Sequence, residues 1–196
     1  MIEFAGASRE SAGRIDDEGW LAAARRVESP NFDVRPSREP ISLIVVHAIS
    51  LPPGEFGSDD IVRLFTNALD ARAHAYFATI STLRVSAHFL IRRDGELVQL
   101  VSCEQRAWHA GLSCWQGREC CNDFSIGIEL EGCDEMAFEP AQYLRLAGLI
   151  ESARARYPID AVVGHSDIAP GRKSDPGPCF DWQKLETLIR QPGCAH

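Results

Sequence analysis

Two short apolar segments that each lead directly into a histidine constrain the fold of this chain more than any other feature. Residues 41–46 read ISLIVV and precede His47, and residues 159–164 read IDAVVG and precede His165. Short runs rich in β-branched residues are typical of strands buried inside a sheet. Because open sheets place ligands and reactive groups beside strand ends, we expect His47 and His165 to converge at one edge of a sheet.

A third candidate ligand, Asp175, follows His165 in the turn-rich sequence GRKSDPGP. Two imidazoles and one carboxylate can hold Zn²⁺ tetrahedrally and leave the fourth position for water, which is the arrangement of a catalytic site. Taken singly, a strand-end histidine is more often solvated or capped, and an aspartate before proline is more often a turn residue. Spacing alone therefore makes a zinc site a hypothesis, and the ordinary interpretation stays open at this point.

The remaining sequence pattern predicts further strands and helices within one domain. Strands are predicted over residues 85–92 and 96–101, joined by a turn at Arg93-Asp94-Gly95, and over 124–131; helices are predicted from Ser58, over 139–157 and over 181–189, with Asp181 as N-cap. Because the elements interleave without a strict βαβ rhythm, we expect the α/β class, with a central mixed β-sheet flanked by helices. The predicted boundaries are a mobile N-terminal tail over residues 1–18, the domain over 19–190 and a C-terminal tail over 191–196.

Charge and cysteine content argue against several classes of function. The formal net charge of −8 disfavours nucleic acid as a partner, since phosphate backbones are bound by clustered Lys and Arg. No stretch of about 18 apolar residues could span a membrane, and the charged N-terminal segment lacks the apolar core of a secretion signal, so we expect a cytoplasmic location. Seven cysteines without a CxxC pair favour reduced thiols over a disulfide framework or a structural zinc site. No exposed apolar stripe stands out, and we expect a monomer.

Seven segments, spread in order from about Gly19 to Trp182, carry a resemblance to a known enzyme family. They are SLIVVH, LPPGEFG, RVSAHFLIRRDGELVQ, RAWHAG, CNDFSIGIELEG, GHSDIAPGRKSDPGP and FDW. These segments resemble the N-acetylmuramoyl-L-alanine amidase family of the T7-lysozyme and peptidoglycan-recognition type. Within that family they are similar to the cytosolic members that act on 1,6-anhydro-muramoyl peptides.

The resemblance implies one catalytic zinc ion at the base of a surface groove. The residues that correspond to its ligands are His47, His165 and Asp175. Glu129 corresponds to the general base that acts on the water, and Lys173 to the residue that stabilises negative charge developing on the substrate carbonyl. Strand periodicity puts Glu129 and Glu131 on the same face and does not distinguish them; the resemblance selects Glu129.

The resemblance also implies residues that contact the substrate. Arg84 corresponds to an arginine that helps to hold the peptide carboxylate, although a solvated strand-end charge is an equally good interpretation. Trp108 and His109 correspond to a groove-lining motif, in which a flat ring can stack on a sugar or peptide face. His88, inside a predicted strand, is expected to be a core histidine or to lie behind the metal ligands.

Three positions depart from the pattern of the cytosolic amidases. Ala48 stands where they usually carry Asn, Cys120 where they usually carry Arg, and Cys179 where they carry a small residue. The arginine is a second anchor for the peptide carboxylate. Because none of these changes removes a zinc ligand or the proposed base, we expect the reaction to be kept and substrate binding to be weaker or differently selective.

The implied function is zinc-dependent hydrolysis of the amide bond between the lactyl group of (1,6-anhydro-)N-acetylmuramic acid and the L-alanine of the stem peptide, in muropeptide recycling. Two alternatives are a non-catalytic module that binds peptidoglycan fragments and a broad amidase acting on polymeric peptidoglycan. The joint presence of Asp175, Glu129 and Lys173 argues against the first, and the lack of an export signal against the second. A thiol redox protein is the weakest alternative. In amidases that change shape on binding, a resting structure can hold Glu129 and Lys173 too far from the ligands to act without contradicting this mechanism.

Overall fold

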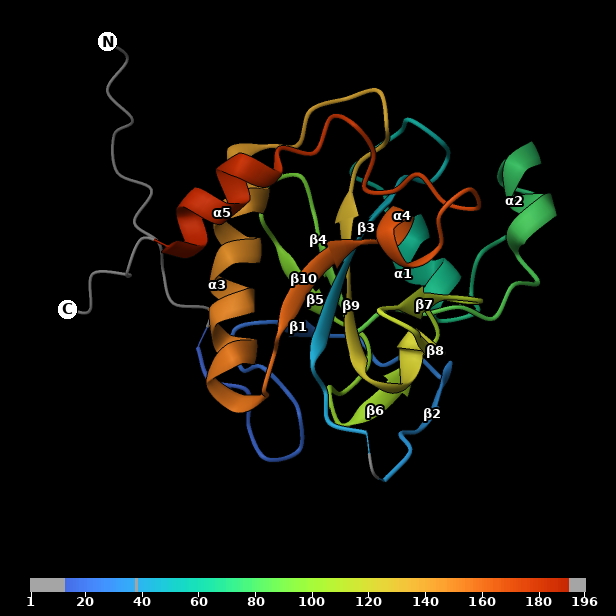
Figure 1. Ribbon diagram of the computed structural model, residues 1–196. Coiled ribbons are helices and arrows are strands. Elements are labelled where there is room, and N and C mark those ends of the chain that lie inside the picture. Colours follow the sequence, from blue (N-terminus) through green and yellow to red (C-terminus); the bar gives the residue numbers. More distant parts are fainter. Residues whose placement is uncertain (1–12, 38, 191–196) are drawn as a thin grey trace, which may run out of the picture.

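The protein is built around one six-stranded sheet, seen in the computed structural model, which describes residues 13–37 and 39–190 (Figure 1). The strand order is β1-β5-β4-β9-β3-β10. The strands are β1 (Arg25–Arg26), β5 (Leu97–Gln99), β4 (Phe89–Ile91), β9 (Ser125–Glu131), β3 (Leu43–Ile49) and β10 (Ala161–Gly164). Neighbours pair in parallel except β4 and β5, which are antiparallel. The expected α/β class with a central mixed sheet is therefore confirmed.

Helices and two small sheets surround the main sheet. The helices are α1 (Asp60–Phe65), α2 (Ala75–Ile80), α3 (Pro140–Arg156), α4 (His165–Ile168), α5 (Trp182–Arg190) and the 3₁₀ turn η1 (Cys121–Asp123). Strand β2 (Phe32–Val34) pairs with β6 (Gln105–Ala107), and β7 (Cys114–Trp115) pairs with β8 (Arg118–Glu119), both antiparallel. Helices α3 and α5 lie on one side of the sheet, and α1, α2 and α4 lie toward the other (Figure 1).

The alternation of side chains along β9 divides the molecule into a core side and a groove side. Ile126, Ile128 and Leu130 are buried in the cluster that also contains the apolar residues of α3. Residues 125, 127 and 129 alternate with them and therefore point to the opposite face of the sheet. Burial of one face under α3 fixes this register, because a one-residue slip would exchange the two sets of side chains.

The helix caps form as the sequence predicts. Pro140 is the first residue of α3, where its missing N–H costs nothing, and the backbone N–H of Glu139 donates to Oε1 of Gln142 at 3.0 Å. At α5, Oδ1 of Asp181 accepts from the backbone N–H of Lys184 at 2.9 Å. Both caps satisfy N–H groups that a helix start leaves without intrahelical partners.

Several boundaries differ from the sequence-based expectation. Strand β3 continues beyond His47 to Ile49, because its edge residues still pair with β9. Helix α1 begins at Asp60 rather than Ser58. Helix α2 was not anticipated; it is capped by His74, whose Nδ1 accepts from the N–H of Tyr76 at 3.1 Å. The segment 107–122, for which no strand was predicted, contains the β7–β8 hairpin.

The two expected tails coincide largely with residues that the structure does not describe. Residues 1–12 and 191–196 lie outside the described residues. Residues 13–18, included in the expected N-terminal tail, pack on the domain: Ile15 is fully buried and forms a β-bridge with Leu21. The described fold therefore begins before Gly19.

Two further expectations concern membranes and thiols. Within the described ranges, no helix is both long and apolar enough to cross a membrane. The six cysteines in this part of the chain are free thiols: Cys103, Cys114, Cys120, Cys121, Cys133 and Cys179.

Candidate metal centre and active site

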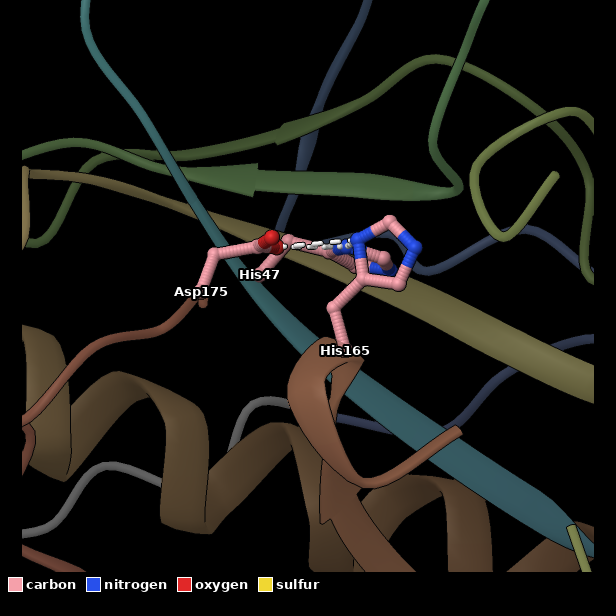
Figure 2. A group of neighbouring side chains, drawn as sticks. All are labelled: His47, His165 and Asp175. Atoms are coloured by element: carbon pink, nitrogen blue, oxygen red, sulfur yellow. Dashed lines mark hydrogen bonds and ion pairs between the residues drawn. The ribbon is translucent and has the colours of Figure 1, made fainter. Parts of the chain in front are cut away.

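Three side chains from separate segments meet beside the main sheet (Figure 2). His47 belongs to β3, His165 begins α4, and Asp175 lies in the following loop. Nδ1 of His47 is 2.9 Å from Nδ1 of His165, and each of these nitrogens is 3.1 Å from Oδ2 of Asp175. The three atoms thus form a nearly equilateral triangle.

Strand pairing explains why the two histidines are neighbours. β3 and β10 run side by side in parallel, with Val46 opposite Gly164, so the next residue of each chain segment, His47 within β3 and His165 just after β10, lies at the same level of the sheet. The loop that carries Asp175 is held by the backbone N–H of Ser166, which donates to the carbonyl of Asp175 at 3.0 Å. The convergence of His47 and His165 that the sequence predicts is therefore observed.

The donor set fits a tetrahedral transition-metal ion. Zinc binds histidine nitrogen and carboxylate oxygen at about 2.0–2.2 Å, which places tetrahedral ligand atoms roughly 3.3 Å apart. The observed separations of 2.9 to 3.1 Å are close to that spacing. Among the described residues this is the one group of three His, Cys, Asp or Glu side chains with such geometry. Two neutral imidazoles and one carboxylate leave a fourth position free for water or substrate.

The electrostatics of the group favour a neutral His47 and an ionised Asp175. Burial lowers the pKa of His47 to about 4, against the opposing hydrogen bond to Asp175. Burial alone would raise the pKa of Asp175, but its contacts with His165 and His47 lower that pKa below its ordinary value. Metal binding requires these protonation states.

Glu129 lies next to this triangle on the neighbouring strand. It pairs with His47 in the parallel register of β3 and β9, so the two side chains share a face. Its Oε2 is buried and has no hydrogen-bond partner among the described residues. Burial and the charge of Asp175 raise the pKa of Glu129 well above its ordinary value, whereas Lys173 acts in the opposite direction.

Glu131, which strand periodicity could not separate from Glu129, is fully engaged in the scaffold. Its Oε1 accepts from the backbone N–H of Gly57 at 2.7 Å, and its Oε2 accepts from the N–H of Arg93 at 3.2 Å. Only Glu129 therefore combines proximity to the triangle with an unbonded carboxylate oxygen.

The triangle opens into a groove of about 610 Å³. His47, His165, Asp175, Glu129 and Lys173 all line it. Glu129 and Lys173 thus share one groove with the three residues of the triangle, and the charge of Lys173 lowers the pKa of Glu129.

The three predicted substrate-contacting residues are placed differently from one another. Trp108 lines the groove. His109 also lines it, but both of its ring nitrogens have partners inside the protein. Arg84 is exposed and absent from the groove lining; its Nη1 donates to the carbonyls of Thr82 and Leu83 at 3.1 and 3.2 Å.

The three residues that depart from the family pattern, Ala48, Cys120 and Cys179, lie in different parts of the molecule. Ala48 lines the groove. Cys120 instead lines a second hollow of about 360 Å³, together with Cys114. Cys179 belongs to neither lining.

Sequence reasoning missed two features of the groove. One is its apolar side, formed by residues of α1, α2 and the segment after them, namely Leu64, Phe65, Tyr76, Ile80 and Leu83. The other is Arg172, which lines the groove and donates through Nη2 to the carbonyls of Ala110 and Leu112. Arg172 adjoins Lys173 in the segment GHSDIAPGRKSDPGP, which points to it as a candidate groove residue. No comparable sequence pattern indicates that α2 contributes to the wall of the groove.

Comparisons with known proteins agree with this site. A family model described as N-acetylmuramoyl-L-alanine amidase matches residues 37–178. The 1,6-anhydro-N-acetylmuramyl-L-alanine amidase AmpD of Citrobacter freundii is 61% identical over 175 residues, which are 88% of this chain and 94% of that protein. A crystal structure of a selenomethionine derivative of AmpD matches with a TM-score of 0.86 at 60% identity, covering 88% of this chain and 98% of that one.

A more distant solved structure carries a bound substrate. It is the complex of the N-acetylmuramyl-L-alanine amidase AmiD from E. coli with anhydro-N-acetylmuramic acid-L-Ala-D-γ-Glu-L-Lys, with a TM-score of 0.56, 34% identity, and coverage of 90% of this chain and 65% of that one. The family match extends over most of the chain and includes all three residues of the triangle. This chain therefore belongs to the N-acetylmuramoyl-L-alanine amidase family.

Proposed function

We propose that this enzyme hydrolyses, with one zinc ion, the amide bond between the lactyl group of 1,6-anhydro-N-acetylmuramic acid and the L-alanine of the stem peptide. The observation that carries the proposal is the triangle of His47, His165 and Asp175 beside the unbonded carboxylate oxygen of Glu129. The 1,6-anhydro substrate is supported by the Citrobacter relative, whose name specifies it, at 61% identity. This activity belongs to the recycling of cell-wall muropeptides.

His47, His165 and Asp175 would hold the zinc ion. Bound there, zinc lowers the pKa of a coordinated water from 15.7 to about 7 and polarises a carbonyl oxygen. Burial keeps the imidazole of His47 neutral, and the contacts of Asp175 with the two histidines keep its carboxylate ionised. The ligand set therefore needs little rearrangement to accept the ion.

Glu129 acts as the general base in this proposal. It takes a proton from the attacking water and later delivers a proton to the departing amine of L-alanine, so that charge does not build up on either. Burial raises the pKa of Glu129, which makes its carboxylate a stronger base for this task. Because Oε2 has no partner in the part of the chain that the structure describes, accepting this proton breaks no hydrogen bond there.

Lys173 stabilises the negative charge that develops on the carbonyl oxygen of the substrate. Lys173 lines the same groove, and its charge lowers the pKa of Glu129. A fixed positive group at a developing oxyanion acts more strongly in the transition state than in the ground state, which is the requirement for catalysis.

Different walls of the groove would contact different parts of a muropeptide. We assign Trp108 to stacking on a sugar or peptide face and the apolar side around Leu64 and Ile80 to the less polar parts of the fragment. Arg84 stays a predicted anchor for the peptide carboxylate; reaching the groove requires its guanidinium to leave the carbonyls of residues 82 and 83. The cytoplasmic location and the monomeric state likewise stay predictions.

Product analysis by mass spectrometry tests this function. The protein is incubated with anhydro-muramoyl tripeptide and, separately, with polymeric peptidoglycan, each with and without a zinc chelator. We expect free tripeptide from the small fragment only, and none when the chelator is present. Cleavage of the polymer at a similar rate would support the broad amidase instead, and binding of either substrate without cleavage by zinc-loaded protein would support a binding module.

A further inference from the structure

A chain of hydrogen bonds runs from His47 away from the groove into the protein. Nε2 of His47 is 3.0 Å from Nδ1 of His109, and Nε2 of His109 is 3.2 Å from Oγ of Ser125. That hydroxyl donates to the backbone carbonyl of Cys121 at 2.5 Å. We call these three contacts the His109 relay.

The carbonyl at the far end sets the direction of every bond in the relay. A carbonyl oxygen can only accept, so Ser125 uses its one proton on Cys121 and can only accept from His109. His109 must therefore carry its proton on Nε2, which leaves Nδ1 as an acceptor. Nδ1 of His109 then accepts from the Nε2–H of His47.

This direction leaves the remaining nitrogen of His47 unprotonated. In a neutral imidazole only one nitrogen carries the proton, so Nδ1 of His47 presents a lone pair to the triangle with His165 and Asp175. The second ligand is fixed by a shorter route: Nε2 of His165 donates directly to the carbonyl of Ala110 at 3.1 Å. Both ligand tautomers are thus set by a backbone carbonyl, one directly and one through two side chains.

The fold keeps a space for the ring of His109. A Cβ atom placed on Gly127 would lie 2.4 to 2.6 Å from three atoms of that ring, which is closer than real Cβ atoms approach. Gly127 lies between Ser125 and Glu129 on the groove face of β9, so the strand that carries the base also accommodates the ring. The rings of His47 and His109 meet edge to face, with centroids 5.0 Å apart.

We infer that His109 is a positioning residue that fixes the orientation and the tautomer of His47 as a metal ligand, rather than a wall of the groove that contacts substrate. The inference rests on the proposed zinc site. Hydrogen bonds behind metal-bound imidazoles typically contribute about 10- to 100-fold to metal affinity. Such an effect would appear in zinc binding without any substrate.

Zinc affinity, measured by competition with a chromophoric chelator, tests the relay. In His109→Phe the ring shape stays but the acceptor is lost, and we expect zinc to bind about 10- to 100-fold more weakly. In His109→Asn an oxygen acceptor stands near the place of Nδ1, and we expect most of the affinity to return. Gly127→Ala displaces the ring and should weaken binding, and Ser125→Ala should have a smaller effect. His74→Phe, which alters an exposed histidine at the start of α2, is the matched control and should bind zinc as the wild type does.

The outcomes separate the relay from the site itself. Zinc binding by His109→Phe at wild-type affinity would overturn the relay, and so would an equal loss in His109→Asn and His109→Phe, because packing alone would then explain both. If His109→Phe fails to fold, as judged by circular dichroism of the metal-free protein, the Asn and Ser125→Ala variants decide between the same outcomes. Wild-type protein that binds no zinc would overturn the proposed function and the relay with it.

Discussion

The floor and the rim of the groove are built in different ways. The floor consists of His47, His165, Asp175 and Glu129; both histidines and Glu129 are buried, and β3, β9 and β10 position three of the four residues. The rim includes Tyr76 and Leu83, which come from α2 and the segment after it; Arg84 follows Leu83 in the chain and lies outside the groove lining. Tyr76 and Leu83 are 39% and 46% exposed, and the guanidinium of Arg84 contacts only nearby backbone carbonyls among its described hydrogen bonds.

This difference suggests a division of labour: the floor carries out the reaction, and the rim selects the substrate. Parallel strand pairing fixes the floor, so a change there alters the metal site or the base directly. The rim depends on short segments that can vary without disturbing the sheet, which is where loops commonly carry specificity. We therefore expect changes at the floor to cost orders of magnitude in rate and changes at the rim to shift binding by small factors.

The largest expected effect comes from Asp175→Ala. The variant keeps two histidine ligands but loses the only carboxylate of the triangle, so both zinc retention and amidase activity should disappear. Metal analysis of the purified variant and the product assay measure the two losses. Full activity in this variant would show that Asp175 is not a ligand.

The next effect separates the base from the metal site. Glu129→Gln keeps the shape of the side chain and should keep zinc, while kcat falls by about 10²- to 10⁴-fold. Glu131→Gln is a matched comparison two residues away; it disturbs the bonds to Gly57 and Arg93 and should act on the thermal midpoint more than on kcat. A normal rate in Glu129→Gln would remove this residue as the base.

Lys173→Met tests the proposal that the charge of Lys173 stabilises the carbonyl oxygen of the substrate. Loss of one such group typically costs about 10²- to 10³-fold in kcat. Zinc affinity should change little, because Lys173 is not a ligand, and steady-state kinetics on the anhydro-muramoyl tripeptide gives the split between kcat and KM. A change confined to KM would make Lys173 a binding residue.

Acid should destabilise the metal-free protein through its buried histidines. Burial lowers the pKa of His47, His88 and His109, so the folded protein keeps them neutral while unfolded histidine takes up a proton near pH 6.5. The stabilisation of the folded state by these neutral histidines is therefore complete above pH 6.5 and is lost as the pH falls toward 4. Glu129 acts in the opposite direction, because its raised pKa favours the folded state on acidification, but it is one group against three. Urea unfolding at pH 7, 6 and 5 with chelator present measures the slope, and a midpoint that rises on acidification would contradict it.

The smallest effect concerns Cys120, which lies outside the groove lining. Cys120→Arg restores the arginine usual in the cytosolic amidases and should lower KM a few-fold for fragments with a free peptide carboxylate. Cys120→Ser is the control for loss of the thiol and should leave KM unchanged. Because Cys120 lines a hollow separate from the groove, an unchanged KM in Cys120→Arg would show that the carboxylate is bound elsewhere.

The sequence predicted the floor better than it predicted the rim, for a physical reason. Buried strands leave a strong apolar pattern, so the segments before His47 and His165 could be placed at one sheet edge from residues alone. Asp175 and the choice of Glu129 over Glu131 needed the family resemblance. The structure shows why: Glu131 is bonded to Gly57 and Arg93, two distant segments that no strand period can identify.

What the sequence did not predict depends on contacts between distant segments. Helix α2 is one short turn-rich stretch with one buried residue, Phe77, and gives almost no helical pattern. The His109 relay joins residues far apart in the chain. The small residues at 125 and 127, alternating with isoleucines on β9, were a visible sign that something packs closely against that face.

The most direct test of the central claim is the position of the metal in crystals grown with zinc, located by anomalous diffraction at the zinc edge. The account predicts one strong peak at about 2.0–2.2 Å from Nδ1 of His47, Nδ1 of His165 and a carboxylate oxygen of Asp175, with Glu129 beside it and not bound to it. A peak bound by cysteines, or zinc at full occupancy elsewhere and none at these three atoms, would contradict it.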